Sequence, residues 1–169
     1  LFDGVLAALP VDNGVVVNFQ GARLFWHWTD AVRAAGHRFE RVLWLYKPND
    51  GTFPWRGWLQ TGQAILLSSI GKPVWGEAEY RHDTYVVNYV GTEIEREHAT
   101  PKPLDVVVHL LGWVSAGAAV VYDPFLGSGT TLIAAERLGR KCYGIEISPK
   151  YCDVILRRWE AETGKTAER

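Results

Sequence analysis

Several kinds of residue are scarce in this chain, and each scarcity excludes a class of structure or function. The 169 residues include only two cysteines, Cys142 and Cys152, and no methionine. Two cysteines exclude a disulfide-built secreted scaffold, and no metal-ligand spacing links them to the five histidines. The net charge of −1 gives no global positive field that would attract nucleic acid. No apolar run is long enough to cross a membrane. We therefore expect one cytoplasmic globular domain with reduced thiols.

The apolar segments that are present alternate between strand-like and helix-like patterns. This alternation predicts an α/β fold, with a mainly parallel sheet and helices on both faces. The turn-rich stretch 47–58 is predicted to be a surface loop. Trp26, Trp28 and Trp44 fall within helix or strand patterns and are predicted to lie in the core. Strands are predicted at 14–19, 38–46, 63–69, 84–89, 118–122 and 141–147, and helices at 2–9, 22–35, 102–115, 132–139 and 149–162.

The most informative segment runs from Asp123 to Thr131 and reads DPFLGSGTT. It joins a predicted strand to a predicted helix, so its two glycines bring backbone N–H groups and a helix N-terminus to one place. Asp123 ends the first strand and Glu146 lies at the end of the next one. Ligands of open α/β sheets bind at such strand ends, and an acid there is suited to accept hydrogen bonds from ribose hydroxyls. The alternative is an ordinary turn with structural glycines, but the paired acids favour a nucleoside site.

The same segment excludes two common phosphate-binding motifs. A Walker loop ends in Gly-Lys-Ser/Thr, and this chain has no lysine between Asp123 and Arg140. The dinucleotide fingerprint has a third glycine three residues after the second, where this chain has Leu132. An acid at the first strand end would also repel a pyrophosphate. A ligand with an amino group, a ribose and no phosphate fits better, and S-adenosylmethionine is such a ligand.

Three motifs in order carry a resemblance to a known family. They are HATPKP at 98–103, DPFLGSGTT at 123–131 and GIEISPKYCDVILRR at 144–158. Together they resemble the DNA amino-methyltransferases, in the permuted class whose cofactor half follows the catalytic half. The resemblance is specific over 98–159 and weaker over 1–97. It implies a methyltransferase-type sheet with one antiparallel strand near an edge. It also implies methyl transfer from S-adenosylmethionine to the exocyclic amino group of adenine or cytosine in duplex DNA, with the target base flipped out.

One element of that family is missing from the sequence. Its catalytic loop contains a Pro-Pro dipeptide followed by an aromatic residue, and no Pro-Pro occurs in this chain. In the permuted order this loop lies just before the position of Leu1. The resemblance therefore implies an incomplete copy at the N-terminal side, with no catalytic residue in the chain. Three alternatives are a binding or regulatory module that no longer catalyses, an RNA methyltransferase, and a nicotinamide oxidoreductase, which Leu132 disfavours.

The candidate site residues follow from the strand-end acids and from the resemblance. By the resemblance, the TPKP segment lines the cofactor pocket. The loop 47–58 mixes cations with aromatic residues, which can hold phosphates and stack on a flipped base. The alternative for its tryptophans is plain packing. No metal is expected. The candidates for the cofactor are Asp123, Pro124, Phe125, Gly127, Ser128, Gly129, Thr130, Thr131, Glu146, Ile147, Thr100 and Lys102, and those for DNA, within the target-facing region 47–97, are Lys47, Trp55 and Arg56.

Overall fold

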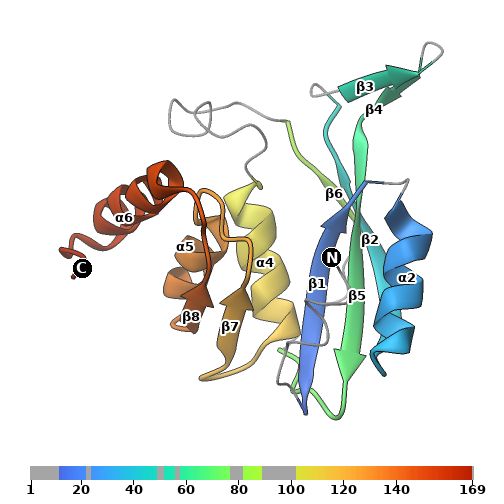
Figure 1. Cartoon of the computed structure of the whole chain (residues 1–169), viewed down its shortest axis with the longest axis horizontal. Helices are drawn as coiled ribbons and strands as arrows, with labels where there is room; N and C mark the ends of the chain where they lie inside the picture. Colours follow the sequence, from blue (N-terminus) through green and yellow to red (C-terminus); the bar gives the residue numbers. More distant parts are fainter. Residues whose placement is uncertain are drawn as a thin grey trace. The chain divides into compact units, whose positions relative to one another are not determined.

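The chain divides into two compact units. The N-terminal unit comprises Leu1–Val74 and Ala78–Tyr89, and the C-terminal unit comprises Trp75–Glu77 and Val90–Arg169. In Figure 1 the elements of the first unit run from blue to green, and those of the second from yellow to red. The computed structural model describes residues 12–21, 24–48, 52–55, 58–76, 82–88 and 102–168. The predicted helix at 2–9 lies outside these residues.

A four-stranded sheet forms the centre of the N-terminal unit. Its strands are β1 (Gly14–Gln20), β2 (Arg38–Tyr46), β5 (Gly62–Ile70) and β6 (Thr84–Val86), in the order β1-β5-β2-β6. The strand β5 pairs antiparallel with both β1 and β2, whereas β2 pairs parallel with β6. Three strands therefore share one direction and only β5 is reversed, next to the edge strand. This arrangement agrees with the expected sheet that has one antiparallel strand near an edge.

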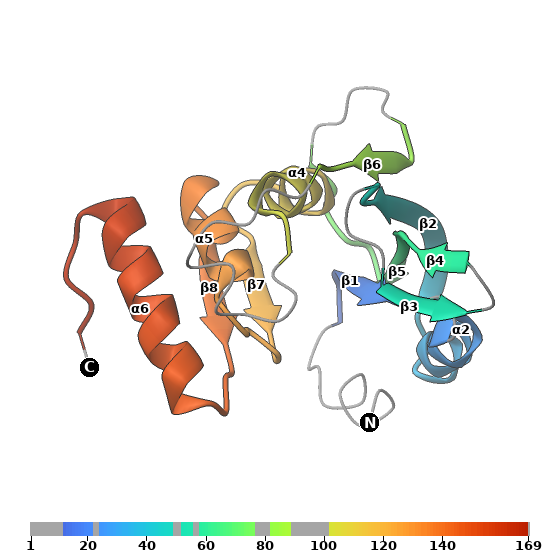
Figure 2. The same cartoon turned by 90° about the horizontal axis from the view of Figure 1, so that it is seen from above.

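The helix α2 (Phe25–Ala34) packs on one face of this sheet (Figures 1 and 2). Its buried residues Trp28, Ala31 and Val32 form a cluster with Leu66 of β5. Positions three and four apart lie on one stripe of a helix, so these side chains all face the sheet. The burial of this stripe is what attaches the helix to the strands.

Two of the three tryptophans predicted to lie in the core are at the surface. Trp28 is buried, with 3% of its surface exposed, but Trp26 is 73% exposed and Trp44 is 42% exposed. Trp26 is two positions from Trp28 on α2, which places it on another face of the helix. Trp44 lies between the buried Leu43 and Leu45 on β2, so its side chain points to the opposite face of the strand. The prediction assigned the right elements but the wrong faces.

The loop predicted at 47–58 contains one strand that the sequence did not indicate and the first residue of another. They are β3 (Thr52–Trp55) and β4 (Trp58–Gln60), and they pair antiparallel with Thr52 opposite Gln60. Pro54 within β3 argued against a strand, but a proline is tolerated in a two-stranded ribbon where its missing N–H faces outward. The β-propensity of threonine, phenylalanine and tryptophan is the signal that the turn residues concealed.

The C-terminal unit contains the motif-bearing segments. Its helices α4 (Leu104–Val114) and α5 (Thr130–Arg137) pack together, and α5 connects two parallel strands. These strands are β7 (Val120–Asp123) and β8 (Lys141–Gly144), paired with Val120 opposite Lys141 and Asp123 opposite Gly144. The last helix is α6 (Pro149–Thr163), which contacts α5. The strand, glycine turn, helix and second strand predicted from the sequence are therefore confirmed.

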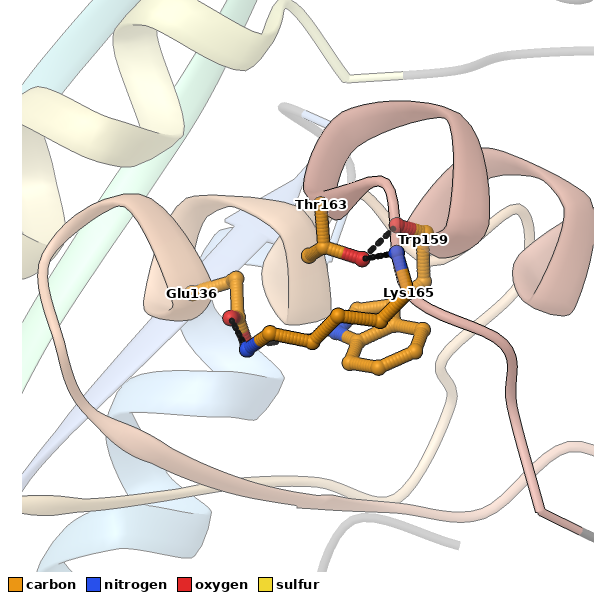
Figure 3. Close-up of polar contacts among 4 residues, drawn as sticks. All are labelled: Glu136, Trp159, Thr163 and Lys165. Atoms are coloured by element: carbon orange, nitrogen blue, oxygen red, sulfur yellow. Dashed lines mark hydrogen bonds and ion pairs between the residues drawn. The ribbon is translucent and has the colours of Figure 1, made fainter.

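Polar contacts at the far ends of α5 and α6 hold the two helices together. The Glu136 carboxylate accepts a hydrogen bond from Trp159 Nε1 at 3.2 Å and pairs with Lys165 Nζ at 3.5 Å. Figure 3 shows the Lys165 side chain passing beside the Trp159 ring, with Nζ 5.7 Å from the ring centroid. Thr163 Oγ1 donates to the Trp159 carbonyl and accepts from the Lys165 N–H, which turns the chain after α6 back onto the helix. Within the described part of the chain, no helix has the length and apolarity that a membrane crossing requires.

Candidate functional site

Asp123 and Glu146 lie near each other at the carboxyl ends of two neighbouring strands. Because β7 and β8 are parallel and in register, both strands end at the same edge. The backbone continues the pairing beyond the strands: the Ile145 N–H donates to the Asp123 carbonyl and the Leu126 N–H donates to the Ile145 carbonyl, each at 2.9 Å. The glycine turn after β7 and the segment after β8 are thereby tied together. The structure brings the two acids that the sequence singled out to one place.

The Glu146 carboxylate bridges these two segments. Its Oε2 accepts a hydrogen bond from the Gly127 N–H and its Oε1 accepts one from the Ser148 N–H, both at 2.8 Å. Bonds from backbone N–H groups to an ionised acceptor are among the stronger ones in proteins. An ionised carboxylate has about four acceptor positions, so about two remain for another partner. Glu146 therefore fixes the glycine turn and still has capacity to bind hydroxyl groups.

The Asp123 carboxylate accepts fewer backbone hydrogen bonds than the Glu146 carboxylate does. Its Oδ1 accepts a hydrogen bond from the Phe125 N–H at 2.9 Å, which is a local turn contact. No hydrogen bond or ion pair to Oδ2 is present among the residues that the structure describes. The side chain is half-buried. One carboxylate oxygen at the strand end is thus available to a cationic or hydrogen-bond-donating group.

The two glycines of the turn both have left-handed backbone conformations. The φ angles are 55° at Gly127 and 83° at Gly129, a region that side chains with a β-carbon disfavour. A β-carbon on Gly129 would also lie 3.0 Å from Cγ1 of Ile155 on α6. The missing side chain at Gly129 therefore makes room for α6. The close neighbour of Gly129 is thus a helix of the same unit.

Ser128 and Thr130 are buried and face an arginine that the sequence analysis did not select. Arg158 Nη1 on α6 donates to the Ser128 carbonyl at 2.6 Å, to Ser128 Oγ at 3.1 Å and to Thr130 Oγ1 at 3.4 Å. These hydroxyls do not cap α5, since that helix has no side-chain cap among the described residues. The signal for Arg158 was its position three residues after Ile155, on the same face of α6. This position identifies Arg158 only once the packing partner of α6 is known.

The N-terminus of α5 presents backbone N–H groups that have no hydrogen-bond partner in the described part of the chain. Ile133 is the first residue of this helix whose N–H reaches a carbonyl, that of Gly129 at 3.1 Å. Among the described residues, the N–H groups of Thr130, Thr131 and Leu132 donate to no such carbonyl and to no side-chain cap. Such groups attract anionic or carbonyl oxygens. They lie immediately after the turn that Glu146 and Arg158 hold.

Exposed apolar side chains surround the strand ends. Ile147 is 93% exposed and Phe125 is 61% exposed, while Pro124 is half-buried. This exposure excludes Ile147 from the core of the unit. Large apolar side chains that remain in water beside polar groups are typical of a surface that binds something.

Cys142 on β8 is half-buried beneath this edge. Burial raises the pKa of its thiol to about 11, and the negative charge of Asp123 adds to the shift. The thiol therefore stays protonated at neutral pH. Within the described residues, no group of three or more histidine, cysteine, aspartate or glutamate side chains could hold a metal ion.

The remaining candidate residues belong to other segments of the chain or lie outside the described residues. Lys102 is half-buried two residues before α4, and Thr100 falls outside the described residues. Lys47 is half-buried at the end of β2, where its N–H donates to the Thr61 carbonyl. Trp55 ends β3, where only its backbone is described, and Arg56 falls outside. A cavity of about 390 Å³ lies at the amino end of β8, lined by Leu132, Glu136, Arg140, Lys141, Cys142, Tyr143 and Trp159.

Comparison with known proteins places the chain in a family. The profile of the DNA methylase family matches residues 26–157. The type II methyltransferase M.HinfI of Haemophilus influenzae is 41% identical over 140 residues, which cover 80% of this chain and 38% of that protein. The type II methyltransferase M.HindIII of Haemophilus influenzae is 30% identical over 132 residues, which cover 71% of this chain and 40% of that protein. The chain thus spans about two fifths of the length of these curated relatives.

The fold agrees with this assignment. The crystal structure of an M1.HpyAVI–SAM complex superposes with a TM-score of 0.79 at 23% sequence identity, covering 93% of this chain and 81% of that one. At this identity the likeness shows the fold. The methyltransferase-type α/β fold predicted from the sequence is confirmed. With the family profile spanning most of its residues, the chain belongs to the DNA methylase family, the N6 and N4 amino-methyltransferases of DNA.

Proposed function

We propose that this chain forms the S-adenosylmethionine-binding part of an enzyme that methylates the exocyclic amino group of adenine or cytosine in DNA. One observation carries the proposal. Asp123 and Glu146 stand at the same edge of two parallel strands, on either side of a glycine turn, and each keeps acceptor capacity beyond its bonds to the backbone. Family membership supports methyl transfer to DNA as the reaction, and the two acids support S-adenosylmethionine as the cofactor.

Each part of the cofactor has a matching group in the chain. The free acceptor positions of Glu146 suit the two ribose hydroxyls, and Asp123 Oδ2 suits the ammonium of the methionine part. The unpartnered N–H groups of Thr130 and Thr131 suit its carboxylate. Ile147 and Phe125 offer exposed apolar surface to the adenine ring. Bound S-adenosylmethionine would supply a methyl group made electrophilic by its positive sulfur.

The residues that would meet DNA belong to the other unit in this proposal. Lys47 and Arg56 would neutralise phosphates, and Trp55 would stack beside an extruded base. Lys102 and Thr100 would line the cofactor pocket, as the family resemblance implies. The chain contains no Pro-Pro dipeptide, so the proposal assigns no catalytic residue within residues 1–169. It assigns the binding of the methyl donor to this chain and leaves the base that receives the methyl group as adenine or cytosine.

Titration calorimetry on the 169-residue chain tests the cofactor assignment. S-adenosylhomocysteine, the product that lacks the transferred methyl group, should bind, and NAD and ATP should bind far more weakly. The contrast follows because the site offers two carboxylates and the loop has no lysine for phosphates. A preference for NAD or ATP would contradict the proposal. Transfer of a labelled methyl group to duplex DNA by the chain alone would show that it contains a catalytic group that we have not assigned.

A further inference from the structure

We propose that Arg158 is a positioning residue for the cofactor, because it fixes the glycine turn whose N–H groups would bind the methionine carboxylate. This inference rests on the proposed function. Arg158 lies on α6, well after the glycine turn in the sequence, and reaches back to three oxygens of the turn. Its nearest partner is the Ser128 carbonyl, 2.6 Å from Nη1. The structure thus indicates that the Arg158 side chain sets the orientation of the turn.

The contact fixes one peptide plane from both sides. In the trans peptide between Ser128 and Gly129, the carbonyl and the N–H point in opposite directions. The carbonyl accepts from Arg158, and the Gly129 N–H donates to the Leu126 carbonyl at 2.9 Å. Rotation of this plane would break both bonds. The N–H groups of Thr130 and Thr131 follow directly along the chain, so their direction depends on this plane.

Burial makes the arginine difficult to replace. Ser128 is 4% exposed and Thr130 is 6% exposed, so water has little access to their oxygens. Without Arg158, one carbonyl and two hydroxyls would be left buried without this donor, which is unfavourable unless the turn moves. On the same face of α6, Ile155 packs against the α-carbon of Gly129. The helix thus holds the turn with an apolar contact and a charged donor side by side.

A turn held in this way is organised before the ligand arrives. Ordering a flexible loop on binding lowers affinity, and a loop that is already ordered avoids that loss. Glu146 fixes Gly127 and Arg158 fixes Ser128, so consecutive residues of the turn are held by side chains from different segments. The loss of Arg158 should therefore weaken contacts to the methionine part of the cofactor while leaving the ribose contact of Glu146 in place.

Two ligands distinguish positioning from general stability. S-adenosylhomocysteine carries the amino-acid carboxylate, and methylthioadenosine lacks the whole amino-acid group. In Arg158→Ala, calorimetry should show the Kd for S-adenosylhomocysteine rising roughly 10- to 100-fold, and that for methylthioadenosine changing less than about threefold. Arg158→Lys should recover part of the affinity because an ammonium can still donate to one of the oxygens. Arg157→Ala, which removes the same charge from an exposed neighbour on α6, is the matched control and should bind both ligands as the parent does.

Thermal melting followed by circular dichroism shows whether each variant is folded. If Arg158→Ala does not fold, the comparison of the two ligands is made with Arg158→Lys. Equal losses for both ligands in a folded variant would mean that Arg158 only stabilises the unit, which overturns the inference. Unchanged binding of both ligands would overturn it as well. In either case the proposed function stands, because the parent chain binds S-adenosylhomocysteine. A parent chain that binds neither ligand overturns the proposed function and this inference with it.

Discussion

Replacing Glu146 by glutamine should affect stability and ligand binding together. Glutamine keeps one carbonyl oxygen but places an NH₂ group where the other carboxylate oxygen accepts an N–H, so one of the two backbone bonds at 2.8 Å is lost. A hydrogen bond to a charged group contributes about 1.5–3 kcal/mol, and the half-buried position of Glu146 favours the lower value. For a chain of 169 residues, a loss of about 1.5 kcal/mol should lower Tm by roughly 3–6 °C.

The binding part of the prediction has its own measurement. If Glu146 accepts the ribose hydroxyls as proposed, removing its negative charge weakens that acceptor, and the Kd for S-adenosylhomocysteine should rise roughly 5- to 100-fold. Asp123→Asn is the matched comparison, because asparagine keeps the oxygen that accepts the Phe125 N–H and removes only the charge. It should weaken binding with little change in Tm. Differential scanning calorimetry and titration calorimetry measure the two effects. A Glu146→Gln variant with the parent's Tm would refute the bridging role of this carboxylate.

Three further predictions follow from single contacts. Gly129→Ala should destabilise the chain by about 1–3 kcal/mol more than Gly139→Ala in thermal unfolding. Both glycines have positive φ, of 83° and 66°, but only at Gly129 would an added β-carbon lie 3.0 Å from a neighbour. Equal effects of the two substitutions would contradict the packing argument. Cys142 should react slowly with iodoacetamide at pH 8 in the folded chain, because its thiol pKa is about 11; rapid modification located by mass spectrometry would show otherwise. Arg137 lowers the pKa of Glu162 through hydrogen bonds at 2.7 and 3.1 Å, so their pairing stabilises the fold above the ordinary carboxyl pKa of 4.5 and is lost as the pH falls through the lowered value. Arg137→Ala should therefore reduce the free energy of unfolding in urea by up to about 1 kcal/mol at pH 7 and by less in acid once Glu162 is protonated, and an equal loss in both conditions would contradict the pairing.

Local patterns in the sequence were sufficient to predict most of the elements. Apolar runs predicted β1, β2, β5 and β7 with small errors at their ends, and the glycine turn between Asp123 and α5 follows directly from its residues. These features depend on neighbours in the chain. The hairpin of β3 and β4 was missed because Pro54 and the nearby turn residues suppress the strand pattern, although pairing across the hairpin overrides them.

Which face of an element is buried was harder to predict. Trp26 and Trp44 lie in the expected helix and strand but are exposed, because each side chain lies on a different face from its buried neighbours. Hydrophobicity favours burial in general and does not select among several tryptophans on one element. Trp28 is buried because it shares a stripe with Val32, which has no exposed surface.

Some residues of the candidate site could also be predicted from local sequence patterns, and others could not. The acids at the strand ends were found because strand ends are recognisable in the sequence, and their carboxylates lie where parallel pairing puts them. The residues that hold the turn from behind were not found, because Arg158 and Ile155 belong to a helix whose packing partner the sequence does not name. The family resemblance assigns the glycine turn a role through the cofactor it would bind. In this chain the turn is held by Glu146 after β8 and by Arg158 on α6, so the proposed binding predicts that a substitution in α6 alters affinity without touching the ligand.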